Sequence, residues 1–161
     1  MTSRQPAGNG APHPARVNPA CALCAGDGGE LVWRDDVLRV ILADEPDYPG
    51  FTRVIWAAHV AEMTDLAPPE RARLMEVVWR VERVQRDVLL PDKVNVASLG
   101  NVVAHLHWHV IPRWREDRHF PQPVWGAPAP GRDEAVARCR RAAQARLEAY
   151  RGALRAACTL R

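Results

Sequence analysis

Three histidines occupy alternate positions in the run Ala104-His105-Leu106-His107-Trp108-His109-Val110-Ile111-Pro112. Successive side chains of a β-strand point to opposite faces, so this run predicts a strand with three imidazoles on one face and apolar side chains on the other. Imidazole is the side chain that acts as a base, nucleophile or metal ligand near neutral pH. The chain has only six histidines, so three on one strand face indicate an active site or a metal site.

Length and composition are those of one globular domain. The chain has 161 residues, of which 47% are hydrophobic and 25% charged, as in ordinary soluble domains. No apolar stretch approaches the roughly 18 residues of a membrane span, and the N-terminal 20 residues lack the apolar core of a secretory signal. We therefore expect a cytoplasmic protein with no membrane association, whose four cysteines are reduced or metal-bound.

The positive charge of the chain is concentrated at its C-terminal end. The formal net charge is +3, and the segment Gly131–Arg161 holds eight arginines against three acidic residues. The rest of the chain is slightly acidic. Charge therefore gives no support to nucleic-acid binding by the main domain.

Hydrophobic periodicity predicts an α+β domain made of short antiparallel strands and one long helix. The helix opens at Pro68 and ends before Pro91, because proline is tolerated in the first turn of a helix and breaks its interior. A second, C-terminal amphipathic helix is expected over Asp133–Ala157, with apolar residues spaced by three or four. Besides the histidine segment, strands are expected at Leu31–Trp33, Val37–Leu42, Phe51–Ala58 and Lys93–Leu99.

We expect three parts along the chain. Residues 1–19 form a flexible leader with little apolar surface, residues 20–125 form the main domain, and residues 126–161 form a linker and the C-terminal helix.

Two kinds of chemistry fit the histidine strand. Alternate imidazoles can bind zinc or copper as a bare metal site. However, Val110–Arg113 adds no carboxylate ligand, and Gly100-Asn101 can bring backbone and an amide close to an anion. These neighbours favour phosphate chemistry.

The sequence resembles the histidine triad family of nucleotide hydrolases and transferases. The run His105–Ile111, followed by Pro112-Arg113, has the alternation of histidine and apolar residues that names the family. Gly50–His59 resembles the family's third strand and the histidine after it. Asn95 and Gly100-Asn101 resemble its phosphate-approach segment. The resemblance covers about residues 20–125 and implies a five-stranded antiparallel sheet in a homodimer that joins two sheets.

The resemblance also implies a mechanism and a substrate class. The middle imidazole, His107, attacks the α-phosphorus of a nucleotide and gives a covalent nucleotidyl-histidine that water cleaves. His109 contacts phosphate oxygens or the leaving group, and the amides of Asn95 and Asn101 add hydrogen bonds beside Gly100. Expected substrates are nucleoside phosphoramidates and dinucleoside polyphosphates, and no catalytic metal is expected. Nucleotidyl transfer and a zinc-stabilised, non-catalytic nucleotide-binding module remain the alternatives.

Two residues bear on the choice between hydrolysis and transfer. Val102 stands where the family often has a serine or threonine, so a hydroxyl contact to phosphate is missing. The third triad position is His109, whereas the branch resembling galactose-1-phosphate uridylyltransferase has glutamine there, which favours hydrolysis.

A second group of candidate ligands is the pair Cys21-x-x-Cys24. Alone, it also fits a redox pair or two ordinary cysteines. Some branches that this chain resembles join such a pair to the histidine after the third strand, here His59, and to the first triad histidine, His105. The resemblance thus implies a structural Cys₂His₂ zinc site. In that case His105 orients the strand and does no direct chemistry.

Two further aromatic residues, His119 and Trp125, stand outside these groups. His119 is expected at the surface. Trp125 is expected to be buried within its own subunit, with an approach to a partner's pocket as the alternative.

Overall fold

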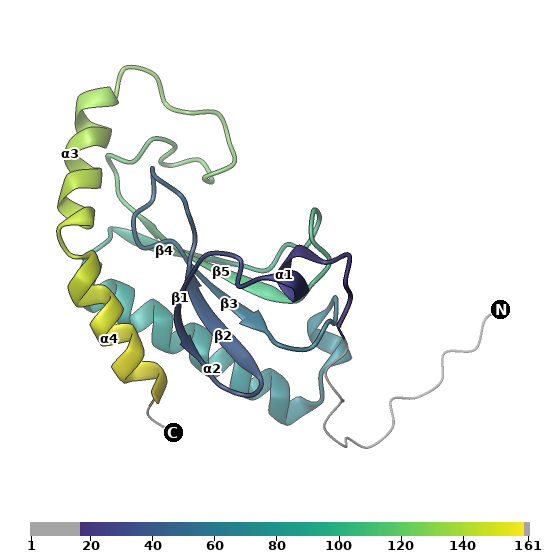
Figure 1. Cartoon of the computed structure of the whole chain (residues 1–161). Coiled ribbons are helices and arrows are strands. Elements are labelled where there is room, and N and C mark those ends of the chain that lie inside the picture. The colour runs from purple at the N-terminus through teal and green to yellow at the C-terminus, as the bar shows by residue number, and fades with distance from the viewer. Residues whose placement is uncertain (1–16, 160–161) are drawn as a thin grey trace.

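The computed structural model describes residues 17–159 and has a five-stranded antiparallel sheet at its centre (Figure 1). The strand order is β1-β2-β3-β5-β4. The α+β class and the antiparallel sheet are confirmed. Most of the predicted leader, residues 1–19, lies outside the described residues. The strands are β1 (Glu30–Arg34), β2 (Leu38–Leu42), β3 (Thr52–Trp56), β4 (Lys93–Ala97) and β5 (His107–Arg113).

Four α-helices and two short helical turns accompany the sheet. The long helix α2 begins at the predicted Pro68, continues through a π-helical turn, and ends at Leu90, which has a left-handed backbone (φ 53°) just before Pro91. No helix in residues 17–159 is long and apolar enough to cross a membrane. The helical segments are α1 (Ala22–Ala25), a 3₁₀ turn (Met63–Asp65), α2 (Pro68–Val84), the π-helical turn (Gln85–Leu89), α3 (Asp133–Gln144) and α4 (Leu147–Thr159).

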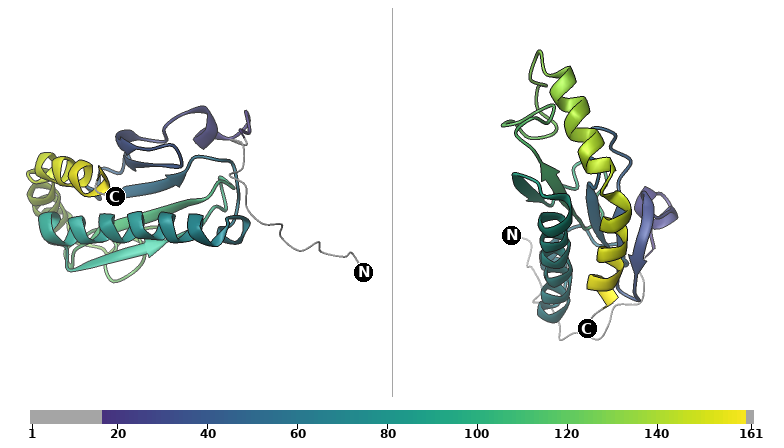
Figure 2. Two further views of the ribbon diagram at one scale, coloured as in Figure 1. Left: turned by 90° about the horizontal axis from the view of Figure 1, so that it is seen from below. Right: turned by 90° about the vertical axis from the view of Figure 1, so that its left-hand side faces the viewer.

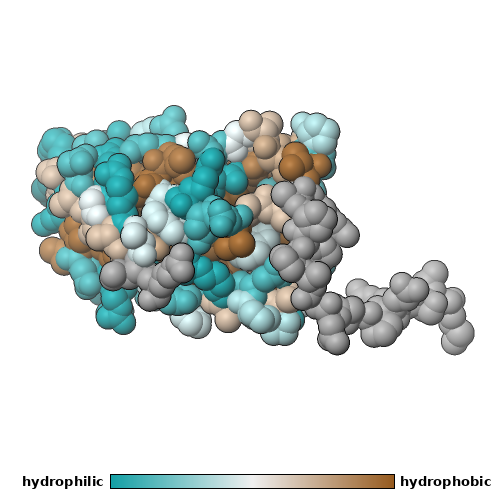
Figure 3. Space-filling view, turned by 60° about the horizontal axis from the view of Figure 1, so that its bottom comes forward, coloured by the Kyte–Doolittle hydropathy of each residue, from teal (hydrophilic) through white to brown (hydrophobic). Residues whose placement is uncertain are grey.

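Helices α2 and α4 cover one face of the sheet and form the main core with it (Figure 2). Val54 of β3 and Val110 of β5 are fully buried there against Val77 and Val81 of α2. Tyr150 of α4 is also fully buried, and its hydroxyl lies 2.7 Å from Thr52 Oγ1. Viewed from this side, the outer surface is mostly hydrophilic, with separate hydrophobic patches (Figure 3). The other face of the sheet is not covered by α2 and α4.

The predicted C-terminal helical segment over Asp133–Ala157 is confirmed, and it consists of two helices, α3 and α4. The helix is interrupted at residues 145–146. On one side, Arg140 of α3 pairs with Asp47. On the other, Leu154 and Cys158 of α4 are buried in the main core. The two helices thus have different neighbours.

His105 lies just before β5, so the predicted strand is shorter at its start than the alternation of histidines suggested. Leu106 bonds outside the regular ladder: its N–H donates to the Val60 carbonyl (2.7 Å), and its carbonyl accepts from the Trp56 N–H (3.1 Å). His105 therefore precedes the regular ladder between β3 and β5, which begins at His107.

Candidate active site and metal centre

His107 and His109 lie on the sheet face opposite the main core. In the antiparallel pair of β3 and β5, Ile55 is the cross-strand partner of His107, and Arg53 is that of His109. Directly opposed residues project to the same face. Phe51, Arg53 and Ile55 of the β3 segment therefore border the two histidines, while the alternate residue Val54 packs in the core.

The His107 ring is held in one tautomer. Its Nδ1 lies 2.6 Å from the carbonyl oxygen of His105, and since a carbonyl can only accept, Nδ1 must carry the proton. Nε2 then keeps its lone pair. The side chain is buried, and this burial lowers the pKa of His107, although the hydrogen bond to the His105 carbonyl opposes the shift. A neutral ring with a free Nε2 lone pair is a competent nucleophile.

His109 sits within a cluster of rings. Its ring centroid lies 4.7 Å from that of His107 and 5.6 Å from those of Phe51 and Trp125, in edge-to-face contacts. Burial lowers the pKa of His109 to about 4, and the positive charges of a protonated His107 and of Arg53 add to this. Its buried Nδ1 has no hydrogen-bond partner among residues 17–159. His109 is thus a neutral ring whose buried Nδ1 lacks a hydrogen-bond partner in the described part of the chain.

The prediction that Trp125 is buried was wrong. Its side chain is 56% exposed, yet it contacts the His109 ring of its own chain. The Trp125 ring therefore lines the site beside His109. His119 is half-buried: its ring stacks on Tyr48, and its Nδ1 lies 2.5 Å from the Tyr48 hydroxyl.

Cys21, Cys24, His59 and His105 converge as the resemblance implied, with ligand atoms all within 4.8 Å of one another. His105 Nδ1 lies 3.5 Å from each cysteine sulfur and 3.3 Å from His59 Nδ1, which is 3.4 Å from Cys24 Sγ. Tetrahedral zinc with ordinary bond lengths places two nitrogens about 3.3 Å apart, and a nitrogen and a sulfur about 3.5 Å apart. The four residues could therefore hold such an ion.

His105 has partners for both of its ring nitrogens. Nδ1 faces the cysteines, while Nε2 lies 2.7 Å from the Trp56 carbonyl and must donate to it. That bond leaves the Nδ1 lone pair for a metal ion, as in many metal sites where a carbonyl orients the ligating imidazole. The Nδ1 of His105 thus faces Cys21, Cys24 and His59, while its backbone carbonyl accepts the hydrogen bond from His107.

The predicted phosphate-binding residues fall in two places. Asn95 of β4 is opposite Ile111 of β5, and its Oδ1 accepts a 2.7 Å hydrogen bond from Arg113. Gly100, with a left-handed φ of 79°, and the exposed Asn101 lie in the loop between β4 and β5. Asn95 is therefore fixed on the sheet, while Gly100 and Asn101 belong to a separate loop.

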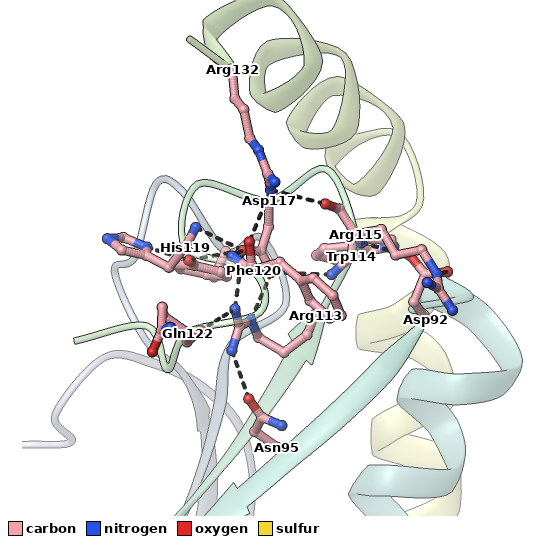
Figure 4. A network of polar contacts seen from close by, with 11 residues as sticks. Asp92, Asn95, Arg113, Trp114, Arg115, Asp117, His119, Phe120, Gln122 and Arg132 are labelled. Carbon is pink, nitrogen blue, oxygen red and sulfur yellow. Dashed lines mark hydrogen bonds and ion pairs between the residues drawn. The ribbon is translucent and has the colours of Figure 1, made fainter. Parts of the chain in front are cut away.

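Sequence reasoning missed the network that fastens the segment after β5 (Figure 4). Arg113 and Asp117 are each 2% exposed and form two hydrogen bonds, of 2.7 and 3.1 Å. Arg113 also donates to the Gln122 carbonyl. Burial alone would raise the pKa of Asp117, but its bonds with Arg113 and with backbone N–H groups lower it overall. Those N–H groups belong to Trp114, His119 and Phe120.

The network explains how Trp125 reaches the site, because it ties down the chain between β5 and that residue. Arg53 was also missed. The one available signal for each was a charge in an otherwise apolar setting: Arg53 within Phe51–Ala58, and Arg113 at the end of the histidine strand.

Comparison with known proteins places this site in a family. The HIT domain model matches residues 28–116. The AP-4-A phosphorylase of Mycobacterium tuberculosis is 30% identical over 125 residues, which cover 74% of this chain and 64% of the relative. The asymmetrical bis(5'-nucleosyl)-tetraphosphatase of Schizosaccharomyces pombe is 28% identical over 95 residues, covering 56% of this chain and 52% of that protein. The chain thus spans less than two thirds of either curated relative.

Solved structures agree with these matches. A histidine triad protein from Bradyrhizobium japonicum has a TM-score of 0.62 and 26% identity, covering 83% of this chain and 99% of the other. A zinc-bound histidine triad family protein from Mycobacterium smegmatis has a TM-score of 0.52 and 30% identity, covering 81% and 96%. With its family model, its relatives and its fold in agreement, the chain belongs to the histidine triad (HIT) family.

Proposed function

We propose that this protein hydrolyses nucleotides at the α-phosphorus through a covalent nucleotidyl-His107 intermediate. The observation that carries the proposal is the 2.6 Å contact between His107 Nδ1 and the His105 carbonyl, which leaves Nε2 unprotonated. Substrates would be dinucleoside polyphosphates or nucleoside phosphoramidates. Both curated relatives bear names of dinucleoside polyphosphate enzymes, which supports the first class.

The reaction has two balanced steps. His107 Nε2 forms a bond to the α-phosphorus as the bond to the leaving oxygen or nitrogen breaks, and the leaving group departs with the bonding electrons and is protonated. Water then attacks the same phosphorus and the P–N bond breaks. The products are a nucleoside monophosphate and neutral His107, with the water's second proton released. Splitting the reaction in this way replaces one difficult displacement by two easier ones.

His109 would stabilise charge on the phosphate or leaving group. Its unpartnered Nδ1 and its ring contact with His107 favour this role. Asn95, Gly100 and Asn101 would hold the nucleotide and its phosphates, with Asn95 using the amide nitrogen that remains after its oxygen bonds Arg113. Trp125 offers an exposed ring at the same place.

We propose further that Cys21, Cys24, His59 and His105 hold a structural zinc ion. The tetrahedral spacing of their ligand atoms supports this, as does the zinc-bound relative from Mycobacterium smegmatis. Zinc would fix α1 against the start of β5 and orient the His105 carbonyl that bonds His107. Metal analysis of protein purified without added metal tests the proposal, and well below half an equivalent of zinc would count against it.

The free edge of β4 suits the expected homodimer. This strand is last in the sheet order, and its Val96 is 38% exposed. Pairing of two such edges would join two sheets and satisfy backbone groups that are otherwise exposed. Sedimentation analysis of the full chain would give twice the monomer mass if this proposal is correct.

A second candidate activity is transfer of the nucleotidyl group to inorganic phosphate. The name of the Mycobacterium tuberculosis relative, AP-4-A phosphorylase, favours it. The first step would be unchanged, but phosphate would replace water in the second. The two activities differ in their products from diadenosine tetraphosphate: AMP and ATP for hydrolysis, but ADP and ATP for phosphorolysis.

The decisive experiment is product analysis with and without inorganic phosphate. We expect AMP and ATP under both conditions and no turnover by His107→Ala. ADP formed only when phosphate is present would favour the phosphorylase. Binding of nucleotide with no turnover of any substrate would favour a non-catalytic binding module.

A further inference from the structure

Arg53 is the feature of this sheet face that the proposed mechanism leaves unused. It is the cross-strand partner of His109, and its guanidinium carbon lies 5.6 Å from the centroid of the Phe51 ring. Phe51 in turn contacts His109 edge-on. Arg53, Phe51 and His109 thus form one continuous cluster.

The guanidinium of Arg53 is only loosely held by the protein. Its ion-pair contact with Glu45 is 3.9 Å long, and its buried Nε has no hydrogen-bond partner among residues 17–159. Arg39, on the neighbouring strand β2, is different because it donates to the carbonyls of Leu23, Gly26 and Asp27. Arg39 therefore has a structural role, whereas Arg53 retains donors for a ligand.

The position of Arg53 relative to His107 suggests which part of a ligand it meets. Arg53 lies opposite His109. His109 is two residues from His107, which is about 6.6–6.8 Å along the strand. Further phosphates that extend from a phosphorus atom on His107 toward His109 would come close to Arg53. The guanidinium of Arg53 lies beside the Phe51 ring, which itself contacts His109, so the cation is close to the His109 end of the site.

We infer that Arg53 binds the phosphates that leave with the second nucleotide, and so selects polyphosphate leaving groups over uncharged ones. This inference rests on the proposed function, because it assumes nucleotidyl transfer to His107. Arginine suits the role since its planar fork donates two parallel hydrogen bonds to phosphate oxygens. Glu45 would lose its weak contact with Arg53 when the phosphates bind.

The test compares two substrates that share an adenylyl group and differ in the charge of the leaving group. Diadenosine tetraphosphate releases ATP, and adenosine 5'-phosphoramidate releases ammonia. In Arg53→Met, kcat/KM for the tetraphosphate should fall roughly 10- to 100-fold, the effect of losing hydrogen bonds to a charged group. The phosphoramidate should be little affected. Arg53→Lys should lose less, because it keeps the charge without the fork.

The control is Arg86→Met, which removes the same charge from the exposed side of the π-helical turn after α2. It should change kcat/KM for neither substrate. Equal losses on both substrates in Arg53→Met, or no loss on either, would overturn the inference. So would wild-type protein that cleaves the phosphoramidate but not the tetraphosphate.

Failure of the wild type on both substrates would refute the proposed function instead. Calorimetric titration with inorganic tripolyphosphate then still tests Arg53, because it requires no turnover. Wild-type protein should bind tripolyphosphate at least tenfold more tightly than Arg53→Met, the effect of losing a charge-assisted hydrogen bond, and Arg53→Lys should fall between the two. Equal affinities would overturn the inference.

Discussion

Replacing Asp117 by asparagine should destabilise the fold strongly, because it removes one charge of a buried ion pair. Arg113 would keep its positive charge at 2% exposure, and its remaining partners would all be uncharged: the oxygens of Asn95 and Gln122, the new amide, and the rings of Tyr48 and Phe120. An uncompensated charge of this kind costs about 3–5 kcal/mol. For a domain of this size, each kcal/mol lowers the melting temperature by roughly 2–4 °C, so a decrease of about 6–20 °C is expected.

The assay is urea denaturation of Asp117→Asn, with thermal melting as a second measurement. Arg115 and Asp92 provide a matched control on the same segment, since their ion pair is 3.5 Å long and its side chains are 79% and 41% exposed. Asp92→Asn should cost less than about 1 kcal/mol. The double variant with Arg113→Met should be less destabilised than the two single costs predict. A loss below about 1 kcal/mol in Asp117→Asn would refute the reasoning, because it would place the charge in water.

Three further outcomes are expected. His109→Gln should slow hydrolysis of the nucleotidyl-enzyme more than its formation, as measured by rapid-quench kinetics; equal losses in both steps would contradict the separate role of His109. The pKa of His109 is lowered to about 4, so an unfolded chain binds its proton first as the pH falls. The contribution of His109 to the free energy of unfolding should therefore be fully present above pH 6.5 and fall by up to about 3 kcal/mol towards pH 4. Denaturation of wild type and His109→Gln at both pH values measures this contribution. An identical pH dependence of the two proteins would exclude His109 as the cause. Tyr150→Phe should cost about 1–3 kcal/mol in urea denaturation because it leaves the buried Thr52 hydroxyl with one partner fewer, and a neutral effect would mean that this contact does not anchor α4.

Local patterns in the sequence predicted the elements that they directly encode. The alternation of residues 107–111 predicted β5, and the helical spacing of valines predicted α2, because each pattern lies within one element. The resemblance to a known family supplied the approach of Cys21 to His105, which are 84 positions apart. No local periodicity contains that information.

The remaining features depend on packing between distant segments. Arg53 looked like an isolated charge in an apolar strand until the register of β3 against β5 placed it opposite His109. The break before α4 separates a helix whose Arg140 pairs with Asp47 from one whose Leu154 is buried in the main core. Trp125 is exposed, because the Arg113–Asp117 network fixes its segment over His109 and not in the core.

The central claim is that His107 forms a covalent bond to phosphorus. Its most direct test is a single-turnover reaction with an adenylyl substrate, quenched under alkaline conditions that preserve phosphohistidine bonds, followed by peptide mass analysis. The account predicts one adenylyl group on the peptide that contains His107, and none in His107→Ala. An adenylyl group on another residue, or rapid turnover by His107→Ala, would contradict it.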